Sequence, residues 1–167
     1  MNNTDKRGVK NIEPSDIIFH PVHFLSLGLG SGLLPFAPGT AGTLLAVLIY
    51  IPLATLPLWG YIAVLILGSL LGVYLCQKTT DRLGVKDHPA IVWDEFLGYW
   101  VTMLLAPEGW EWILVGFILF RLFDIWKPWP ISVIDHKVKG GLGIMLDDLL
   151  AGAYALVILQ LSYYFIS

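Results

Sequence analysis

Five carboxylates stand beside the ends of apolar segments, where they could bind a metal ion or work on a substrate. They are Asp94, Glu95, Asp124, Asp147 and Asp148. Because so many like charges at one place repel one another, a metal ion or nearby basic side chains must compensate them. Carboxylate oxygens suit Mg²⁺ or Mn²⁺ rather than zinc, and the sequence has no Cys/His cluster with zinc spacing.

A simpler interpretation covers part of this set. Carboxylates at helix N-termini complement the helix dipole, which would explain the pairs at 94–95 and 147–148. Asp124 does not fit, because it ends an apolar segment, where a negative charge is unfavourable. Arg121 and Lys127 flank it at i−3 and i+3. A salt bridge with Arg121 is the simplest account of Asp124 alone.

Two glycine-containing strings are further candidates for the site. In PGTAGT, residues 38–43, Gly39, Thr40 and Thr43 precede an apolar segment. Free backbone N–H groups at a helix start, with threonine hydroxyls, could bind an anion, although a tight turn and an N-cap explain the string as well. In KGGLGIMLDD, residues 139–148, the glycines permit close backbone approach or form a flexible loop that ends in a helix cap.

The composition predicts that these residues belong to a membrane protein. Of 167 residues, 56% are hydrophobic and 14% charged, against about 45–50% and about 25% in soluble domains. The excess apolar surface must face lipid. The net charge of −3, without a basic stripe, argues against nucleic acid as a partner. The length predicts one domain over residues 1–167, with a polar cytoplasmic segment at 1–20.

The apolar segments predict an all-α, polytopic membrane protein with about four transmembrane helices. Phe24–Phe36, interrupted by glycines and a proline, is expected to form an additional short interfacial or re-entrant helix. The segments that follow it are Thr43–Pro57, Leu58–Cys76, Trp93–Ala106, Trp110–Trp126 and a last one from Asp147 to Ile166.

The basic residues predict the orientation. All ten Lys and Arg residues fall on one side of the expected spans, and the opposite loops hold only Glu108 and Glu111. The positive-inside rule places the amino terminus and the two long polar loops in the cytoplasm and the carboxyl terminus outside. The five carboxylates then gather at the cytoplasmic surface. A small transporter would instead hold carboxylates near the bilayer midplane. The residues therefore favour a metal-dependent membrane enzyme acting on a phosphorylated molecule at the cytoplasmic leaflet.

Four strings resemble motifs of the phosphatidylglycerophosphatase A family, in the family's order, from about Leu27 to Gly152. They are GLGSGLLPFAPGTAGT, IVWDEFLG, FRLFDIWKPWPI and GGLGIMLDDLLAG. The resemblance implies a Mg²⁺-dependent lipid phosphatase of the bacterial inner membrane, with its active site facing the cytoplasm. Its substrate would be phosphatidylglycerophosphate, among membrane lipids, and its product phosphatidylglycerol. The signatures of CDP-alcohol phosphotransferases and of PSGH-type phosphatases are absent.

Residue roles follow from the resemblance together with the residue types. Asp94, Glu95, Asp124, Asp147 and Asp148 would be metal ligands, and all of them except Asp147 are also candidates for catalysis. Arg121, Lys127 and Lys137 would bind the phosphate, and Gly39, Thr40 and Thr43 would orient it. The nucleophile is either water or an aspartate that forms an acyl phosphate. The absence of a DxDx[TV] string favours water.

The orientation is testable with reporter fusions. A reporter after Ser167 should be periplasmic, and reporters in the loops around Arg82 and Lys137 should be cytoplasmic, because the basic residues are one-sided. A periplasmic signal from either loop would contradict the convergence of the carboxylates at the cytoplasmic surface.

Overall fold

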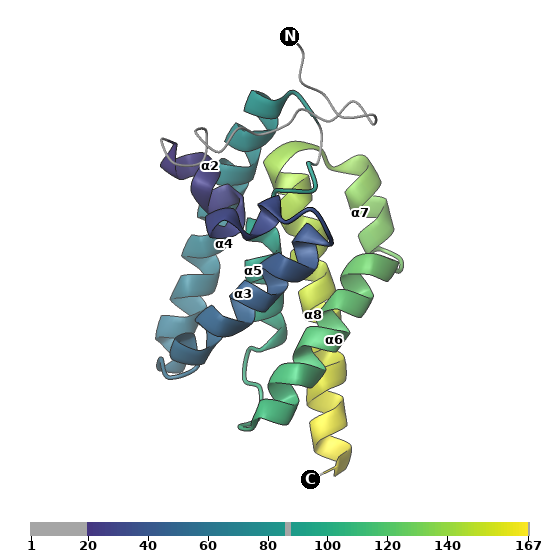
Figure 1. Cartoon of the computed structure of the whole chain (residues 1–167). Helices are drawn as coiled ribbons and strands as arrows, with labels where there is room; N and C mark the ends of the chain where they lie inside the picture. Colours follow the sequence, from purple (N-terminus) through teal and green to yellow (C-terminus); the bar gives the residue numbers. More distant parts are fainter. Residues whose placement is uncertain (1–19, 86–87, 167) are drawn as a thin grey trace.

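The computed structural model describes residues 20–85 and 88–166, and over these ranges the chain is helical with no strand (Figure 1). The all-α prediction is therefore confirmed for this part of the chain. The elements are α2 Pro21–Ser26, the 3₁₀ helix η1 Gly28–Leu33, α3 Pro38–Leu53, α4 Leu58–Leu83, α5 Trp93–Thr102, α6 Trp110–Trp126, α7 Ile131–Lys137 and α8 Gly140–Ile166.

Helices α5 and α8 form the inside of the bundle. α8 packs against α4, α5, α6 and α7, and α5 also contacts α3, α4 and α6. Figure 1 shows α5 and α8 behind α3 and α6, which cross the front of the bundle. Most residues of α5 are buried, including both acidic residues of its first turn. The element that carries Asp94 and Glu95 is thus surrounded by the helices that carry the other candidate residues.

Glycines allow α5 and α8 to touch. A Cβ atom at Gly152 would overlap the carbonyl oxygen of Gly98, and one at Gly98 would lie 2.8 Å from the carbonyl oxygen of Asp148. Backbones can approach this closely only where no side chain intervenes. This crossing lies one turn from Glu95 on α5 and one turn from Asp148 on α8, so it fixes the separation of the two carboxylates.

A second close approach sets the start of α8. A Cβ at Gly141 would overlap the carbonyl oxygen of Val73, and the side-chain oxygen of Gln77 accepts a hydrogen bond of 2.8 Å from the Gly141 N–H. The close approach predicted for KGGLGIMLDD is confirmed, but the string is helical. The helix begins at Gly140, not at Asp147 as predicted, because α4 supplies packing for the extra turns.

Other boundaries also differ from the prediction. α3 begins at Pro38, so PGTAGT forms its first two turns instead of preceding it. α4 continues past Cys76 to Leu83, where Gly84 in the left-handed region ends it. α5 ends at Thr102, short of Ala106, whereas α6 has the predicted bounds. The segment Phe24–Phe36 holds the end of α2 and η1, the latter interrupted by positive φ angles, as expected of a short broken helix.

The expected number of transmembrane helices is not confirmed. Among the described residues, α4 and α8 are long and apolar enough to cross a membrane, with 26 and 27 residues. α3, α5 and α6 have 16, 10 and 17 residues, fewer than the ~20 of a straight crossing. α5, at about 15 Å, is half the thickness of a hydrocarbon core.

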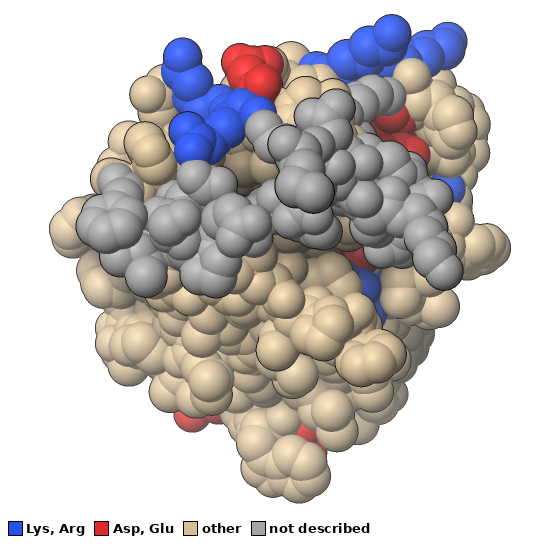
Figure 2. Space-filling view, turned by 45° about the horizontal axis from the view of Figure 1, so that its top comes forward, with Lys and Arg blue, Asp and Glu red and all other residues tan. Residues whose placement is uncertain are grey.

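The charged residues divide the bundle into two unlike ends. In Figure 2 the visible Lys and Arg side chains lie toward one end or in a hollow below it, and the opposite end shows only acidic side chains. Exposed Lys78 and Arg82 of α4 lie at the basic end with Lys137 and Lys139. Lys6, Arg7, Lys10 and Lys86, and the polar segment 1–20 except for His20, lie outside the described residues. The one-sided pattern holds for the basic residues that the structure places.

The glycine contact between α5 and α8 predicts a stability difference between two matched variants. Gly152→Ala should lower the free energy of unfolding by about 1–3 kcal/mol, because the new methyl group meets the Gly98 carbonyl. At Gly60, the nearest neighbours of an added Cβ would be side-chain atoms of Pro57 and Leu56, at 3.6 Å or more. Gly60→Ala should therefore be neutral or stabilising. Thermal unfolding in detergent measures both. Equal melting temperatures would show that the crossing can relax at no cost.

Candidate functional site

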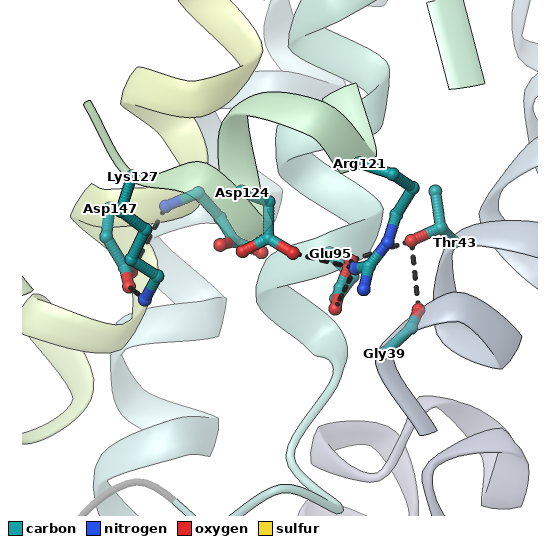
Figure 3. Close-up of polar contacts among 8 residues, drawn as sticks. Gly39, Thr43, Glu95, Arg121, Asp124, Lys127 and Asp147 are labelled. Atoms are coloured by element: carbon teal, nitrogen blue, oxygen red, sulfur yellow. Dashed lines mark hydrogen bonds and ion pairs between the residues drawn. The ribbon is translucent and has the colours of Figure 1, made fainter. Parts of the chain in front are cut away.

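Arg121 joins two of the predicted carboxylates. Its Nη1 donates to both oxygens of Glu95, at 2.6 Å to Oε1, and lies 2.8 Å from Oδ2 of Asp124 (Figure 3). The three side chains come from the last two turns of α6 and the first turn of α5 and are mostly buried. The predicted pairing of Asp124 with Arg121 is confirmed. It is not an isolated surface salt bridge, however, because it belongs to a larger and mostly buried network.

The start of α3 supplies two more contacts to Glu95. The Thr43 hydroxyl is fully buried, donates to Glu95 Oε2 at 2.7 Å and also lies 2.9 Å from the Gly39 carbonyl oxygen. Figure 3 shows Gly39, Thr43 and Arg121 on one side of the Glu95 carboxylate. A Cβ at Gly39 would overlap Glu95 Oε1, so glycine is required for this approach. Thr43 and Gly39 therefore place Glu95; in the structure they are not a free anion site.

Lys127 forms the second cationic centre. Its ammonium lies 2.6 Å from Oδ2 of Asp147 on α8 and 3.2 Å from Oδ1 of Asp135 on α7. Burial alone would lower the pKa of Lys127, but its hydrogen bond to Asp147 and the charges of Asp147 and Asp135 outweigh that effect. The pKa of Lys127 is raised above its ordinary value, so the side chain stays charged.

Asp148 lies at the centre of the acidic residues. Asp124, Asp94, Glu95 and Asp147 all lie close enough to repel its carboxylate electrostatically. The Asp148 Oδ2 atom is buried and has no hydrogen-bond partner among the described residues. The five carboxylates that the sequence singled out therefore converge. Because Asp147 and Asp148 stand two turns inside α8, the helix-cap interpretation does not apply to them.

The donor set fits a hard divalent cation in its chemistry. Two cations face five carboxylates, of which Asp94, Glu95, Asp147 and Asp148 are buried. A buried oxygen of Asp148 also lacks a partner among the described residues. Such a site favours a further positive charge. As they lie, however, no three or more Asp, Glu, His or Cys side chains among the described residues are grouped closely enough to hold a metal ion. Arg121 and Lys127 occupy oxygens that a metal would need.

The remaining predicted residues are less closely involved. Thr40 lies in the first turn of α3, half-buried, and no hydrogen bond joins its side chain to the carboxylates. Lys137 is exposed at the end of α7, and no ion pair joins it to the described carboxylates of the cluster. Asp135, which sequence reasoning missed, contacts Lys127. Asp135 lies in a short helix without apolar periodicity, so the sequence did not indicate how far its side chain is buried or toward which helix it points.

Comparison with known proteins gives consistent matches. The family model described as phosphatidylglycerophosphatase A matches residues 24–163. A phosphatidylglycerophosphatase A of Escherichia coli K12 is 48% identical over 84% of this chain and 82% of its own length. A phosphatidylglycerophosphatase A of Haemophilus influenzae is 47% identical over 84% of this chain and 88% of its own length. A putative phosphatidylinositol-3-phosphatase of Bacteroides thetaiotaomicron is 39% identical over 86% of this chain and 94% of its own length. No solved structure matches the chain.

All four strings from which the resemblance was read lie wholly within the matched residues 24–163. The matched range also contains every residue of the Arg121 and Lys127 networks. On the extent of this match and the identity to its relatives, the chain belongs to the phosphatidylglycerophosphatase A family.

Proposed function

We propose that this protein hydrolyses phosphatidylglycerophosphate to phosphatidylglycerol and inorganic phosphate, at the cytoplasmic face of a bacterial inner membrane. The observation that carries the proposal is the convergence of five carboxylates with Arg121 and Lys127 at one end of the bundle. A phosphate monoester needs cations to bind it and carboxylates to hold a metal or accept a proton. Two relatives bear the name of this phosphatase.

We place the bundle in a membrane with about four spans, and its outer surface supports the membrane setting. α4 exposes Leu67 and Leu70, and α6 exposes Leu114, Ile118, Leu122 and Ile125 along one stripe. Contiguous apolar surface of this kind marks contact with lipid or protein. In a bilayer, these faces would contact acyl chains while the basic end reaches the headgroups. A lipid substrate could then keep its chains in the bilayer and present its phosphate to the cluster.

Magnesium is the cofactor that we propose for the carboxylates. Asp94, Glu95, Asp147 and Asp148 are buried, Asp124 is mostly buried, and these five would supply the ligands. When bound, Mg²⁺ polarises phosphoryl oxygens and stabilises the leaving alkoxide. The side chains must rotate away from their present cations to bind it, since they are paired with Arg121 and Lys127 in the structure.

The protein side chains divide the remaining tasks. The Arg121 Nε–H is buried without a partner, so this guanidinium retains a donor for a phosphoryl oxygen while Nη1 holds Glu95 and Asp124. Lys127 supplies a second positive charge to the phosphate. Asp148 accepts the proton of the attacking water at Oδ2, the oxygen without a partner. Thr43 keeps Glu95 in place through its hydroxyl.

Phosphate release by purified protein tests the activity and the metal together. We expect inorganic phosphate from phosphatidylglycerophosphate in the presence of Mg²⁺, none after EDTA treatment, and recovery when Mg²⁺ is added back. Phosphatidylinositol 3-phosphate serves as the comparison substrate, because one relative is named for that lipid. Full activity in chelator would refute the metal proposal, and preference for the inositol lipid would refute the proposed substrate.

Charge removal at Asp124 and Asp148 separates catalytic from structural carboxylates. Asp124→Asn and Asp148→Asn should each lower turnover at least ~100-fold, about 2.7 kcal/mol of transition-state stabilisation. Both should insert and melt within a few degrees of the wild type, because Asn keeps the size of the side chain. Glu111→Gln, an exposed change in the first turn of α6, is the matched control and should be fully active. A folded variant that retains more than about a third of normal turnover would remove that residue from the active site.

A further inference from the structure

The two cations of the cluster differ in their surroundings. Every partner that the structure gives Arg121 is a carboxylate of the cluster, Glu95 or Asp124. Lys127 is shared between Asp147, which is buried in the cluster, and Asp135, which lies on α7 and is about one third exposed. Asp135 is outside the set of proposed metal ligands. Lys127 therefore has a second acceptor that remains available if Asp147 changes partner.

Lys127 and a metal ion would compete for the same oxygen. The ammonium lies 2.6 Å from Asp147 Oδ2, within direct hydrogen-bonding distance. A divalent cation that binds this carboxylate must displace the ammonium or share the oxygen with it at a repulsive distance. The free energy of breaking the Lys127–Asp147 pair is then subtracted from the free energy of metal binding.

We infer that Asp135 is a positioning residue that receives the Lys127 ammonium when Mg²⁺ takes Asp147. In the metal-free protein, Lys127 neutralises the buried Asp147; in the metal-bound protein, it pairs with Asp135 and stays charged beside the site. Asp135 lowers the cost of the exchange, because a lysine with no alternative acceptor would have to leave its ion pair for solvent. The inference rests on the proposed metal dependence.

The geometry around Lys127 favours this change of partner. The residue follows the last turn of α6 in the left-handed conformation, with φ 44°, and Pro128 comes next. The backbone turn ends the helix and sends the side chain between α7 and α8, where both acceptors lie. The ammonium makes both contacts at once, 3.2 Å from Asp135 Oδ1 and 2.6 Å from Asp147 Oδ2, so it keeps an acceptor in place when Asp147 is taken.

The inference predicts opposite changes in Mg²⁺ affinity for two variants, measured by calorimetry on the full chain in detergent without substrate. Lys127→Gln removes the competitor and should bind Mg²⁺ about tenfold more tightly than the wild type. Asp135→Asn removes the alternative acceptor and should bind it about tenfold more weakly. Asp135→Glu should restore most of the affinity. Glu108→Gln, an exposed change at the opposite end of the bundle, controls for loss of one negative charge.

A double variant separates positioning from a simple charge effect. If Asp135 acts through the lysine, Asp135→Asn should change Mg²⁺ affinity little when Lys127→Gln is already present. An equal loss in both backgrounds, or weaker binding by Lys127→Gln, would overturn the inference alone. A wild-type protein that binds no Mg²⁺ would overturn the metal proposal as well. Asp135→Asn leaves the Lys127–Asp147 pair intact, so its Mg²⁺ affinity tests the inference even if Lys127→Gln does not fold.

Discussion

The structure depends on neutralising five carboxylates in an otherwise apolar bundle. Four of them, Asp94, Glu95, Asp147 and Asp148, are at most 9% exposed. Uncompensated charges at such depth cost several kcal/mol each. Both compensating cations come from the end of α6: Arg121 pairs with Glu95 and Asp124, and Lys127 with Asp147. α6 therefore joins α5 and α8 electrostatically at one end, in addition to packing against both of them.

Close backbone packing makes this arrangement possible. Gly98 and Gly152 bring α5 and α8 together next to the acidic residues, and Gly39 admits the Glu95 carboxylate to the start of α3. Close packing and charge pairing act on the same residues, because moving α8 away would separate Asp147 and Asp148 from α6. Stability and site geometry are thus coupled, and a defect in the glycine contacts should affect both.

The sequence predicted the convergence of the site better than the boundaries around it. Hydrophobicity and the one-sided lysines and arginines placed Asp94, Glu95, Asp124, Asp147 and Asp148 at one end, and the pairing of Asp124 with Arg121 followed from i, i+3 spacing. The start of α8 could not be predicted, because Gly140–Gly143 have low helix propensity and are helical through packing on α4. Asp135 and the Thr43–Glu95 bond depend on contacts across 8 and 52 residues that no local pattern encodes.

Two of the four described non-glycine residues with a left-handed backbone conformation adjoin the elements that carry the site. Ala37, which precedes α3, and Lys127, which follows α6, both have left-handed backbone conformations without being glycine, with φ of 48° and 44°. Each such residue costs about 1–2 kcal/mol, and strain of this kind persists where surrounding contacts determine the conformation. At Lys127 those contacts are its ion pairs, since a helical continuation would point the side chain elsewhere. At Ala37 the backbone directs the first two turns of α3, which carry Gly39 and Thr43, toward Glu95. At these two residues, the chain therefore gives up local stability to direct polar groups at the carboxylates.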